Sequence, residues 1–440
     1  SKLEIDLNKF DLFNLDSFNK LEDKENIYFS KWWDYPRFKI NKNDSSKINH
    51  LEDLLVNSVK KQLISDAPLG AFLSGGIDSS LIVAIASKFI SDLQTFTIGF
   101  DFDKYDESKY AKKISNYFGT KHETLICSKD DVINNIEYLQ EAYTEPFADS
   151  SQLPTLLVSK IAKSKVKVAL SGDGGDELFG GYNRYSFSNK YWKIINFLPI
   201  SIRSNLLRIF NTLPSSVIDV ILKFILSKDT TRNNSNSKNI INKLIKIQSD
   251  FDFYNSFITE YSEASVINDD YLLNHNFKDT FQNFEFNNIT EKMMACDFVT
   301  YMTDDILCKV DRASMFNSLE VRAPYLDRDL VNFVINLPFD KKIKNNKTKI
   351  IQREILESYI PMEFFDRPKM GFSIPLSDWL KTDLKEFMND ALSHNTLNKH
   401  NFFNIDKEKL IKDNHEKNIE NNASKLWALI QFNLWYENNF

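Results

Sequence analysis

The sequence from residue 70 to residue 80 reads G-A-F-L-S-G-G-I-D-S-S. Residues 71–73 are short and apolar, as at the end of a buried strand, and the apolar run 81–86 that follows is typical of a helix. Between them, residues 74–76 predict a tight polar turn. A strand, a glycine turn and a helix in this order point backbone N–H groups at an anion. We therefore expect an anion-binding loop here.

The residue types in this loop suit a phosphate. Gly75 and Gly76 have no Cβ, so the backbone can come close to a ligand. Hydroxyl donors are available from Ser74, Ser79 and Ser80. Asp78 would repel a phosphate unless a cation lay between them, which predicts Mg²⁺. A glycine turn before a helix also occurs in α/β proteins without a ligand, so the turn alone leaves that alternative open.

Composition narrows the class of protein. The chain has 440 residues, 42% of them hydrophobic, and a net charge of −6, which indicates a globular protein with one large or two domains and disfavours nucleic acid as the main partner. No apolar run is long enough for a membrane span, so no membrane partner is expected. Cys127, Cys296 and Cys308 are scattered, which predicts a reduced, cytoplasmic protein without a zinc site.

The pattern along the chain predicts an α/β fold with a doubly wound, mostly parallel sheet. We expect one apolar strand to end at residues 70–73, and further apolar strands at 94–100, 122–126 and 166–170. These strands alternate with expected helices at 110–118, 130–143 and 153–162. After Gly181 we expect helices and no strand. We divide the chain into a lead-in at 1–48 that packs through aromatic residues, an α/β core at 49–185 that carries the anion-binding loop and a large all-helical portion at 186–440.

A second glycine-rich loop follows the predicted strand 166–170. It reads S-G-D-G-G-D-E from residue 171 to residue 177. Its three acids repel one another unless a cation or donor offsets them, so Asp176 could share Mg²⁺ with Asp78. A calcium-like or merely solvated acidic loop is the alternative. Because ligands bind at the carboxyl ends of parallel strands, both loops should lie at one edge of the sheet.

These motifs resemble a known superfamily. The S-G-G-I-D-S stretch looks like the pyrophosphate loop of the ATP pyrophosphatases, which include GMP, NAD, argininosuccinate and asparagine synthetases and share an adenine nucleotide alpha-hydrolase-like core. The run from Ser171 to Tyr182 resembles the second signature of the asparagine synthetase family. Further matching pieces lie at 145–151, 309–312, 320–327, 347–349 and 367–372, and the resemblance covers about residues 28–438. It implies the synthetase domain of a glutamine-dependent asparagine synthetase.

The resemblance also implies roles for individual residues. Contacts to adenosine are implied for Leu73, Ser74 and Ile98. Binding of pyrophosphate and Mg²⁺ is implied for Gly75, Gly76, Asp78, Ser79 and Ser80, with Asp176 as a second metal ligand. Gly172 and Asp173 would line the AMP and acyl side, although some relatives carry Glu where this chain has Asp173. The acyl pocket would be shaped by the segments that contain Glu145, Asp149 and Arg322.

Lys349 is a candidate catalytic residue on physical grounds as well. It ends the basic segment 341–349 and would open a helix, where an ammonium near a leaving pyrophosphate offsets developing charge. A solvated basic loop is the alternative reading of this segment.

The implied reaction joins a carboxylate to ammonia. The substrate carboxylate, aspartate first among the candidates, attacks the α-phosphate of ATP and gives an acyl-adenylate and pyrophosphate, and ammonia then displaces AMP. No cysteine occurs before Cys127, so we expect a glutaminase domain or subunit outside these residues, and turnover with ammonium but not with glutamine. Two other substrates stay open, a sugar carboxylate and a β-amino acid cyclised on itself. Two other functions also stay open, a silent ATP-binding scaffold and a tRNA-modifying pyrophosphatase. The protein could also be a homodimer.

Overall fold

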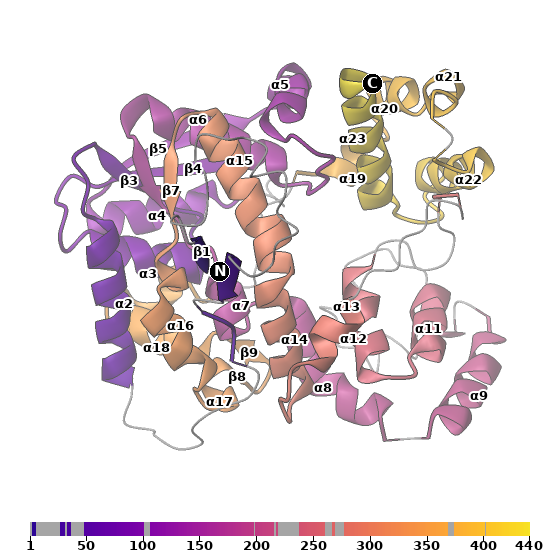
Figure 1. Ribbon diagram of the computed structural model, residues 1–440, viewed down its shortest axis with the longest axis horizontal. Helices are drawn as coiled ribbons and strands as arrows, with labels where there is room; N and C mark the ends of the chain where they lie inside the picture. Colours follow the sequence, from indigo (N-terminus) through magenta and orange to yellow (C-terminus); the bar gives the residue numbers. More distant parts are fainter. Residues whose placement is uncertain are drawn as a thin grey trace.

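The computed structural model describes residues 2–5, 27–30, 33–36, 48–100, 106–197, 199–214, 217–218, 237–259, 266–268, 277–367, 374–400 and 402–440. At its centre is a five-stranded sheet with the order β5-β4-β3-β6-β7 (Figure 1). All four strand pairs are parallel. The strands are β3 Leu69–Phe72, β4 Gln94–Phe100, β5 Lys121–Cys127, β6 Val168–Leu170 and β7 Glu320–Arg322.

The order of the strands creates a switch point in the middle of the sheet. The chain builds β3, β4 and β5 outward to one side, and then returns to place β6 and β7 on the other side. Ala71 of β3 consequently pairs with Thr95 of β4 on one side and with Leu170 of β6 on the other. Ligands of open α/β sheets bind in the crevice outside such a point, which here lies between the ends of β3 and β6.

Helices cover both faces of the sheet, and the predicted fold class is confirmed. The cluster of buried residues on one face includes Ala71 of β3 with Ile82 and Ile114 of the helices that follow β3 and β4. The cluster on the other face includes Phe96 of β4 and Leu156 of the helix before β6. The helices of this part are α2 Ile48–Gln62, α3 Ile77–Ala86, α4 Ser108–Phe118, α5 Lys129–Ala142, α6 Gln152–Lys165 and α7 Gly175–Phe179.

The sequence pattern predicts no strand after Gly181, and that prediction is wrong. β7 pairs in parallel with β6, and Ser171 N donates to Arg322 O at 2.8 Å. A short antiparallel pair, β8 Ile343–Lys344 and β9 Lys347–Thr348, also forms. Strands of two or three residues are too short to show the alternation of apolar and polar residues that identifies a strand in sequence. The hydrogen bonds to a distant partner strand define β7 instead.

The rest of the chain is helical. The remaining helices are α8 Asn183–Ile195, α9 Ile200–Asn211, α11 Ser237–Lys246, α12 Asp250–Ile258, α13 Phe277–Gln282, α14 Ile289–Val299, η4 Met302–Leu307, α15 Cys308–Phe316, η5 Pro324–Leu326, α16 Arg328–Ile335, α17 Phe339–Lys342, α18 Ile350–Glu357, η6 Met362–Phe364, α19 Leu376–Trp379, α20 Lys385–Ala391, α21 His394–Leu397, α22 Ile405–Glu416 and α23 Ala423–Asn439. Figure 1 shows α14 and α15 end to end as one long rod beside the sheet, with the π-helical turn η4 between them.

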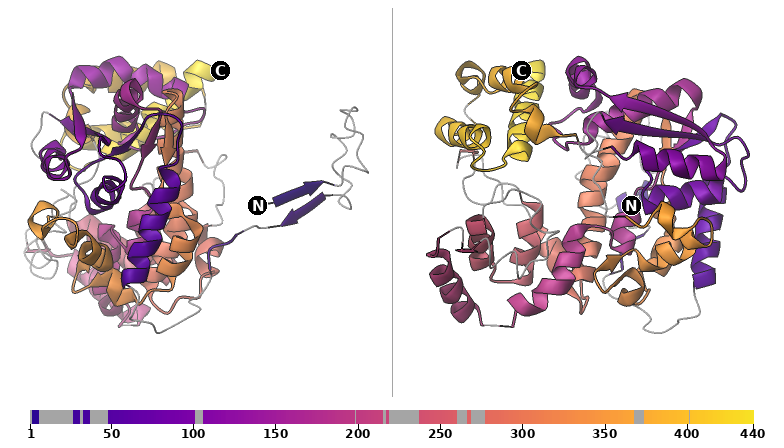
Figure 2. Two further views of the ribbon diagram at one scale, coloured as in Figure 1. Left: turned by 90° about the vertical axis from the view of Figure 1, so that its left-hand side faces the viewer. Right: turned by 180° about the vertical axis from the view of Figure 1, so that it is seen from behind.

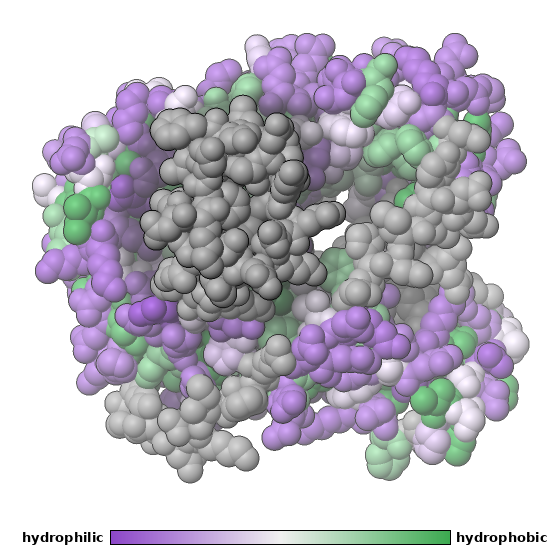
Figure 3. All heavy atoms as spheres, viewed as in Figure 1, coloured by the Kyte–Doolittle hydropathy of each residue, from purple (hydrophilic) through white to green (hydrophobic). Residues whose placement is uncertain are grey.

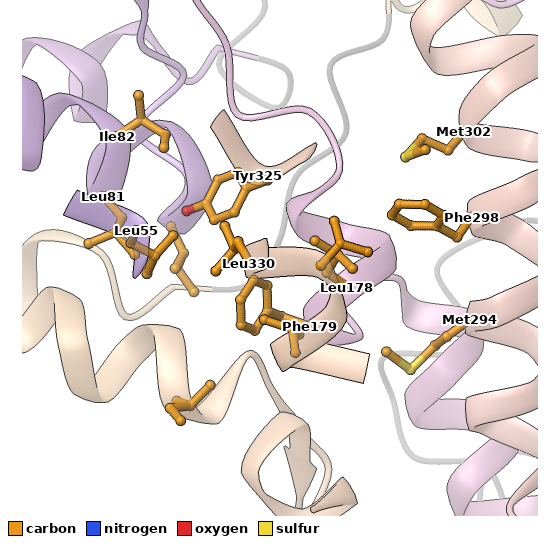
Figure 4. Close-up of a cluster of buried hydrophobic side chains, with 14 of the residues drawn as sticks. Leu55, Leu81, Ile82, Leu178, Phe179, Met294, Phe298, Met302, Tyr325 and Leu330 are labelled. Carbon is orange, nitrogen blue, oxygen red and sulfur yellow. The ribbon is translucent and has the colours of Figure 1, made fainter. Parts of the chain in front are cut away.

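Buried side chains hold the helical portion against the sheet. Figure 4 shows Leu55 of α2, Leu81 of α3, Phe179 of α7 and Leu330 of α16 gathered around Tyr325. All five are fully buried. Burying a side chain of this size contributes roughly 1.5–3 kcal/mol. The cluster therefore fixes the helices that carry both glycine loops relative to α16 and the chain around it.

The N-terminal part is described only in pieces. β1 Lys2–Ile5 and β2 Ile27–Ser30 form an antiparallel pair that projects away from the body (Figure 2). Trp33 packs edge-on against Phe298, and its Nε1 donates to Asn332 Oδ1 at 3.1 Å, so the expected aromatic packing is confirmed at this position. The other lead-in residues, and residues 368–372 of the motif at 367–372, lie outside the described residues.

The surface seen in Figure 3 is largely hydrophilic, with hydrophobic side chains gathered at the lower right over α9. Ile202, Leu206 and Ile209 are exposed there.

Within the described ranges, no helix combines the length and the apolar character needed to cross a membrane.

Candidate functional site: two glycine loops joined by a lysine

The two glycine loops meet at the carboxyl edge of the sheet. The first leads from β3 into α3, and the second leads from β6 into α7. A Cβ at Gly172 would lie 3.0 Å from Cβ of Asp78, and a Cβ at Gly175 would collide with the carboxylate of Asp78. Only glycine at these two positions lets the second loop lie directly on the first.

The first loop is shaped by its own serines. Ser74 N donates to Ser79 Oγ at 3.1 Å, and Gly76 N donates to Ser74 Oγ at 3.2 Å. Gly75 has a φ of +75°, which favours glycine, and a Cβ there would lie 2.9 Å from Ala111 N. Gly76 caps α3 without any side-chain hydrogen bond, so the first N–H groups of α3 have no side-chain cap. The predicted anion-binding geometry, a strand, a glycine turn and an uncapped helix start, is present.

Lys349 connects the two loops. Its Nζ forms an ion pair with Asp78 Oδ2 and a second with Asp176 Oδ1 at 2.6 Å. Gln352, one turn further along α18, donates from Nε2 to Asp78 Oδ1 at 3.1 Å. Lys349 is the N-cap of α18 in the left-handed region, at φ 58°, and its relative exposure is 5%. Lys349, which the sequence pattern predicts at the start of a helix, thus forms ion pairs with both of the carboxylates that we proposed as metal ligands.

The charge of Lys349 is held by its neighbours. Burial by itself would lower the pKa of this ammonium, but the carboxylates of Asp176 and Asp78 outweigh burial and raise the pKa above its ordinary value. Lys349 is therefore positively charged at neutral pH. In the absence of a ligand it supplies the cation that two neighbouring carboxylates need.

The two carboxylates also fit a divalent cation. Asp78 and Asp176 contact one ammonium, so both are within reach of a single cation. No group of three or more His, Cys, Asp or Glu side chains suited to a metal occurs in the described part of the chain. Mg²⁺ is usually held by one or two carboxylates together with substrate phosphates. The donor set is compatible with Mg²⁺ that arrives with a nucleotide.

A cavity adjoins the second loop. Its volume is about 450 Å³. The residues that line it are Ser171, Asp173, Leu307, Cys308, Val310, Asp311, Arg312, Ser314, Val321 and Ala323. Burial raises the pKa of the Asp173 carboxyl, and the ammonium of Lys309 partly opposes that rise. Asp173 thus places a carboxyl group on the wall of a space large enough for a small molecule.

The π-helical turn η4 adds a second charged cluster. Lys309 Nζ contacts Asp149 Oδ2 at 2.8 Å and Asp305 Oδ1 at 3.8 Å. Burial and the nearby Asp149 raise the pKa of Asp305. Burial would also raise the pKa of Asp149, but Lys309 outweighs it and lowers that pKa. Sequence reasoning proposed Asp149 alone. Lys309 could have been found from the sequence, because it lies in the segment 309–312 that matches the family. Nothing in the sequence pointed to Asp305.

The other proposed residues make no side-chain contact with Lys349 that the structure shows. Leu73 is buried and donates its N–H to Phe96 O at 2.9 Å, and Ile98 is buried in β4. Glu145 is exposed. The Arg322 guanidinium contacts Gln62 O at 2.7 Å, Ile64 O at 2.8 Å and Glu320 Oε1 at 2.6 Å, which ties β7 to the end of α2. Its neighbours Val321 and Ala323, rather than Arg322, line the cavity.

A buried polar network holds the second loop from behind. Tyr182 Oη donates to Glu177 Oε1 at 2.6 Å, and the Arg184 guanidinium lies 4.3 Å from the Tyr182 ring centre. Arg184 in turn pairs with the fully buried Asp297 of α14 at 3.0 Å. Asp297 also accepts hydrogen bonds from Tyr185 and Tyr254. The network links the loop after β6 to the long α14–α15 rod.

The fold and these paired loops define an α/β protein of the adenine nucleotide alpha-hydrolase-like class. A family model described as asparagine synthase matches residues 50–437, and the chain belongs to that family. The chain is 29% identical over 399 residues to asparagine synthetase [glutamine-hydrolyzing] 1 of Bacillus subtilis, which covers 89% of this chain and 59% of the relative.

Two further relatives differ in how much of the chain they match. A putative asparagine synthetase [glutamine-hydrolyzing] of Mycobacterium tuberculosis is 28% identical over 410 residues, covering 91% of this chain and 60% of the relative. Asparagine synthetase B [glutamine-hydrolyzing] of Escherichia coli is 34% identical over 172 residues, covering 35% of this chain and 30% of the relative. The chain thus spans about three fifths of the length of the two relatives that match most of it.

Proposed function

We propose that this chain catalyses the ATP-dependent formation of an amide from a small carboxylate and ammonia, through an acyl-adenylate, with release of AMP and pyrophosphate. The observation that carries the proposal is the position of Lys349, buried between Asp78 of the first loop and Asp176 of the second. Family membership supports the same chemistry. A scaffold that only held the fold together would not need a charged lysine and two carboxylates at the switch point of the sheet.

In this proposal the first loop binds the phosphates of ATP. The uncapped N–H groups of α3 and the hydroxyls of Ser74 and Ser79 donate to the departing pyrophosphate. Lys349 moves part of its contact from the carboxylates to phosphate oxygens, where it stabilises the charge that grows as the bond to the α-phosphate breaks. Asp78 and Asp176 would hold Mg²⁺, which neutralises phosphate charge when it is bound. Leu73 and Ile98 are proposed to flank the adenosine.

The acyl substrate is proposed to lie on the side of Asp173. The cavity there has both apolar walls, from Leu307, Val310 and Val321, and charged groups. Its volume of about 450 Å³ accommodates a molecule of amino-acid size. Aspartate is the first candidate, and ammonia is proposed to come from a glutaminase domain or subunit, in keeping with the glutamine-hydrolyzing relatives. Binding in this cavity would align the substrate carboxylate with the α-phosphate of ATP. Such alignment of the two reactants is a main source of the rate acceleration in this type of reaction.

An exchange experiment tests the proposal and identifies the carboxylate. Radioactive pyrophosphate should enter ATP only when a carboxylate that forms an adenylate is present. The screen should include aspartate, β-amino acids and sugar carboxylates, and a parallel assay should measure amide formation with ammonium. Exchange with one class of carboxylate would support the proposal and name the substrate. Absence of exchange with every carboxylate, in protein shown to be folded, would contradict it.

A further inference from the structure

Arg367 lies beside the first glycine loop without a role in the proposed reaction. Its Nη2 pairs with Glu107 Oε1 at 2.8 Å and lies 3.5 Å from Ser74 O. Its guanidinium is 4.3 Å from the centre of the Tyr110 ring. Tyr110 itself borders the loop, because a Cβ on Gly75 would lie 2.9 Å from Cβ of Tyr110. Arg367 is therefore held beside the loop by its ion pair with Glu107 and by the packing of its guanidinium against the Tyr110 ring.

Two nitrogens of this guanidinium have no acceptor within the described ranges of the chain. Nε and Nη1 of Arg367 are buried and make no hydrogen bond among the residues that the structure describes. Leaving a buried donor unsatisfied destabilises the folded protein, and more so when the group is charged. A buried polar group without a partner calls for an explanation, and a bound ion is one of the recognised explanations. Phosphate oxygens suit this arrangement, since the planar guanidinium binds them in pairs.

The first loop is thus contacted, at Ser74 and at Asp78, by two cations that come from one stretch of chain. Lys349 begins α18 and reaches Asp78, and Arg367 follows η6 and reaches Ser74. Arg353 of α18 ties the two ends together, because its Nη1 pairs with Asp366 at 2.7 Å and its Nε donates to Thr348 O at 3.0 Å. The segment from residue 349 to residue 367 holds both cations in a fixed relation to the loop.

We propose that Arg367 is a pyrophosphate-binding residue, which donates from Nε and Nη1 to the pyrophosphate portion of ATP while Glu107 keeps the guanidinium over Tyr110. The proposal rests on the proposed function, because it assigns a further ligand to the same nucleotide. Lys349 and Arg367 then bind the leaving group from the two sides of the Ser74–Asp78 turn. The competing role is purely structural: Arg367 would only clamp the loop to Glu107 at the start of α4.

Binding of three probes separates these roles. Calorimetry should compare inorganic pyrophosphate with Mg²⁺, ATP with Mg²⁺, and AMP. For Arg367→Ala we expect binding of pyrophosphate and ATP to weaken about 10- to 100-fold, the range for losing hydrogen bonds to a charged group, with AMP binding unchanged. Arg367→Gln keeps the aliphatic part of the side chain without its charge and should behave in the same way if Arg367→Ala does not fold.

Two further variants serve as controls. Glu107→Gln removes the negative charge but keeps an oxygen that accepts a hydrogen bond from Arg367 Nη2, so the guanidinium stays in place and pyrophosphate should bind at least as tightly as to the unmodified protein. Lys347→Ala removes a cation two positions before Lys349 whose side chain is 64% exposed, and should leave pyrophosphate binding within about twofold. Melting temperatures of all variants would confirm that each is folded.

The outcomes distinguish this inference from the function on which it rests. Equal binding of pyrophosphate by the unmodified protein and Arg367→Ala would overturn the inference, and so would equal losses in Arg367→Ala and Glu107→Gln, since these define a clamp. If the unmodified protein bound neither ATP nor pyrophosphate, the proposed function itself would fail.

Discussion

At the scale of single residues, the proposed site depends most on Lys349. Its ammonium replaces, within the protein, the cation that Asp78 and Asp176 would otherwise require. Both carboxylates raise its pKa, so the group stays charged in a place where burial alone would favour the neutral amine. A lysine so placed can pass between carboxylate and phosphate oxygens without a change in its protonation.

Lys349→Ala should slow pyrophosphate release by about 10²–10³-fold, the usual cost of removing one group that stabilises transition-state charge. Lys349→Arg should recover little, because a planar guanidinium does not fit a site closed around a compact ammonium. Single-turnover release of pyrophosphate at saturating ATP measures both effects. Lys347→Ala is the matched control, since Lys347 lies two positions away and is 64% exposed. Equal rates for Lys349→Ala and Lys347→Ala would contradict a transition-state role for Lys349 and leave it a structural link between Asp78 and Asp176.

At the scale of elements, the close contact of the two glycine loops sets the geometry of the site. Gly172 and Gly175 lie on Asp78, and a Cβ at Gly181 would collide with Asp176 and Lys349. Glycine at these positions is therefore explained by contact with a catalytic candidate rather than by backbone conformation. Gly174 and Gly180, by contrast, have φ values of 87° and 73° and serve the turn itself.

Gly175→Ala should abolish ATP-dependent pyrophosphate release while the melting temperature changes little, because the new methyl group displaces the Asp78 carboxylate at the edge of the fold. Gly119→Asn is a suitable control. Gly119 has a φ of +69° and no heavy atom within 4 Å of a Cβ built there, and Asn tolerates this conformation. The control should retain activity. An active Gly175→Ala variant would show that Asp78 can be displaced without loss of function.

Helix α22 offers a pH-dependent test of packing remote from the site. Burial raises the pKa of Glu408 from 4.5 to about 7. Between these pH values the folded chain keeps a proton that the unfolded chain has lost, so the free energy of unfolding falls as the pH rises from about 4.5 to about 7. Glu408→Gln cannot lose that proton. Its melting temperature relative to that of the unmodified protein should rise across this window, and a constant difference would contradict the prediction.

At the scale of the whole molecule, the site is assembled from parts that are far apart in sequence. Asp78 follows the first strand of the parallel sheet, Asp176 follows the fourth, and Lys349 comes from the helical portion 271 positions after Asp78. A nucleotide bound here would contact both loops and α18 together. It would therefore stabilise the sheet and the helical portion as one unit.

ATP with Mg²⁺ should raise the melting temperature, because a ligand at 100 times its Kd adds about 2.7 kcal/mol to the free energy of unfolding when it binds only the folded state. Calorimetric melting with ATP and Mg²⁺, and with ATP and a chelator, measures the effect and the share that depends on the cation. Asp78→Asn should lose most of the gain from Mg²⁺. The same gain in Asp78→Asn and in the unmodified protein would place the nucleotide elsewhere.

The sequence by itself determined the parallel sheet from β3 to β6, the two glycine loops at one edge of it, and the composition of both loops. The prediction succeeded because these features are local: strand 94–100 is a continuous apolar and β-branched run, and glycine, serine and aspartate have strong positional preferences in turns. Seven of the chain's 11 glycines fall in the turn 74–76 and in the run from Ser171 to Tyr182, which made both stretches conspicuous.

Only the tertiary structure decided which side chains meet. Local pattern gave no sign of β7, whose three residues form a strand because β6 offers hydrogen-bond partners. Nor could it show that Lys349 contacts both carboxylates, or that Arg322 is tied to the end of α2. Each of these contacts joins residues more than 140 positions apart, and such pairs are fixed by the packing of helices against the sheet, about which the neighbouring residues carry no information.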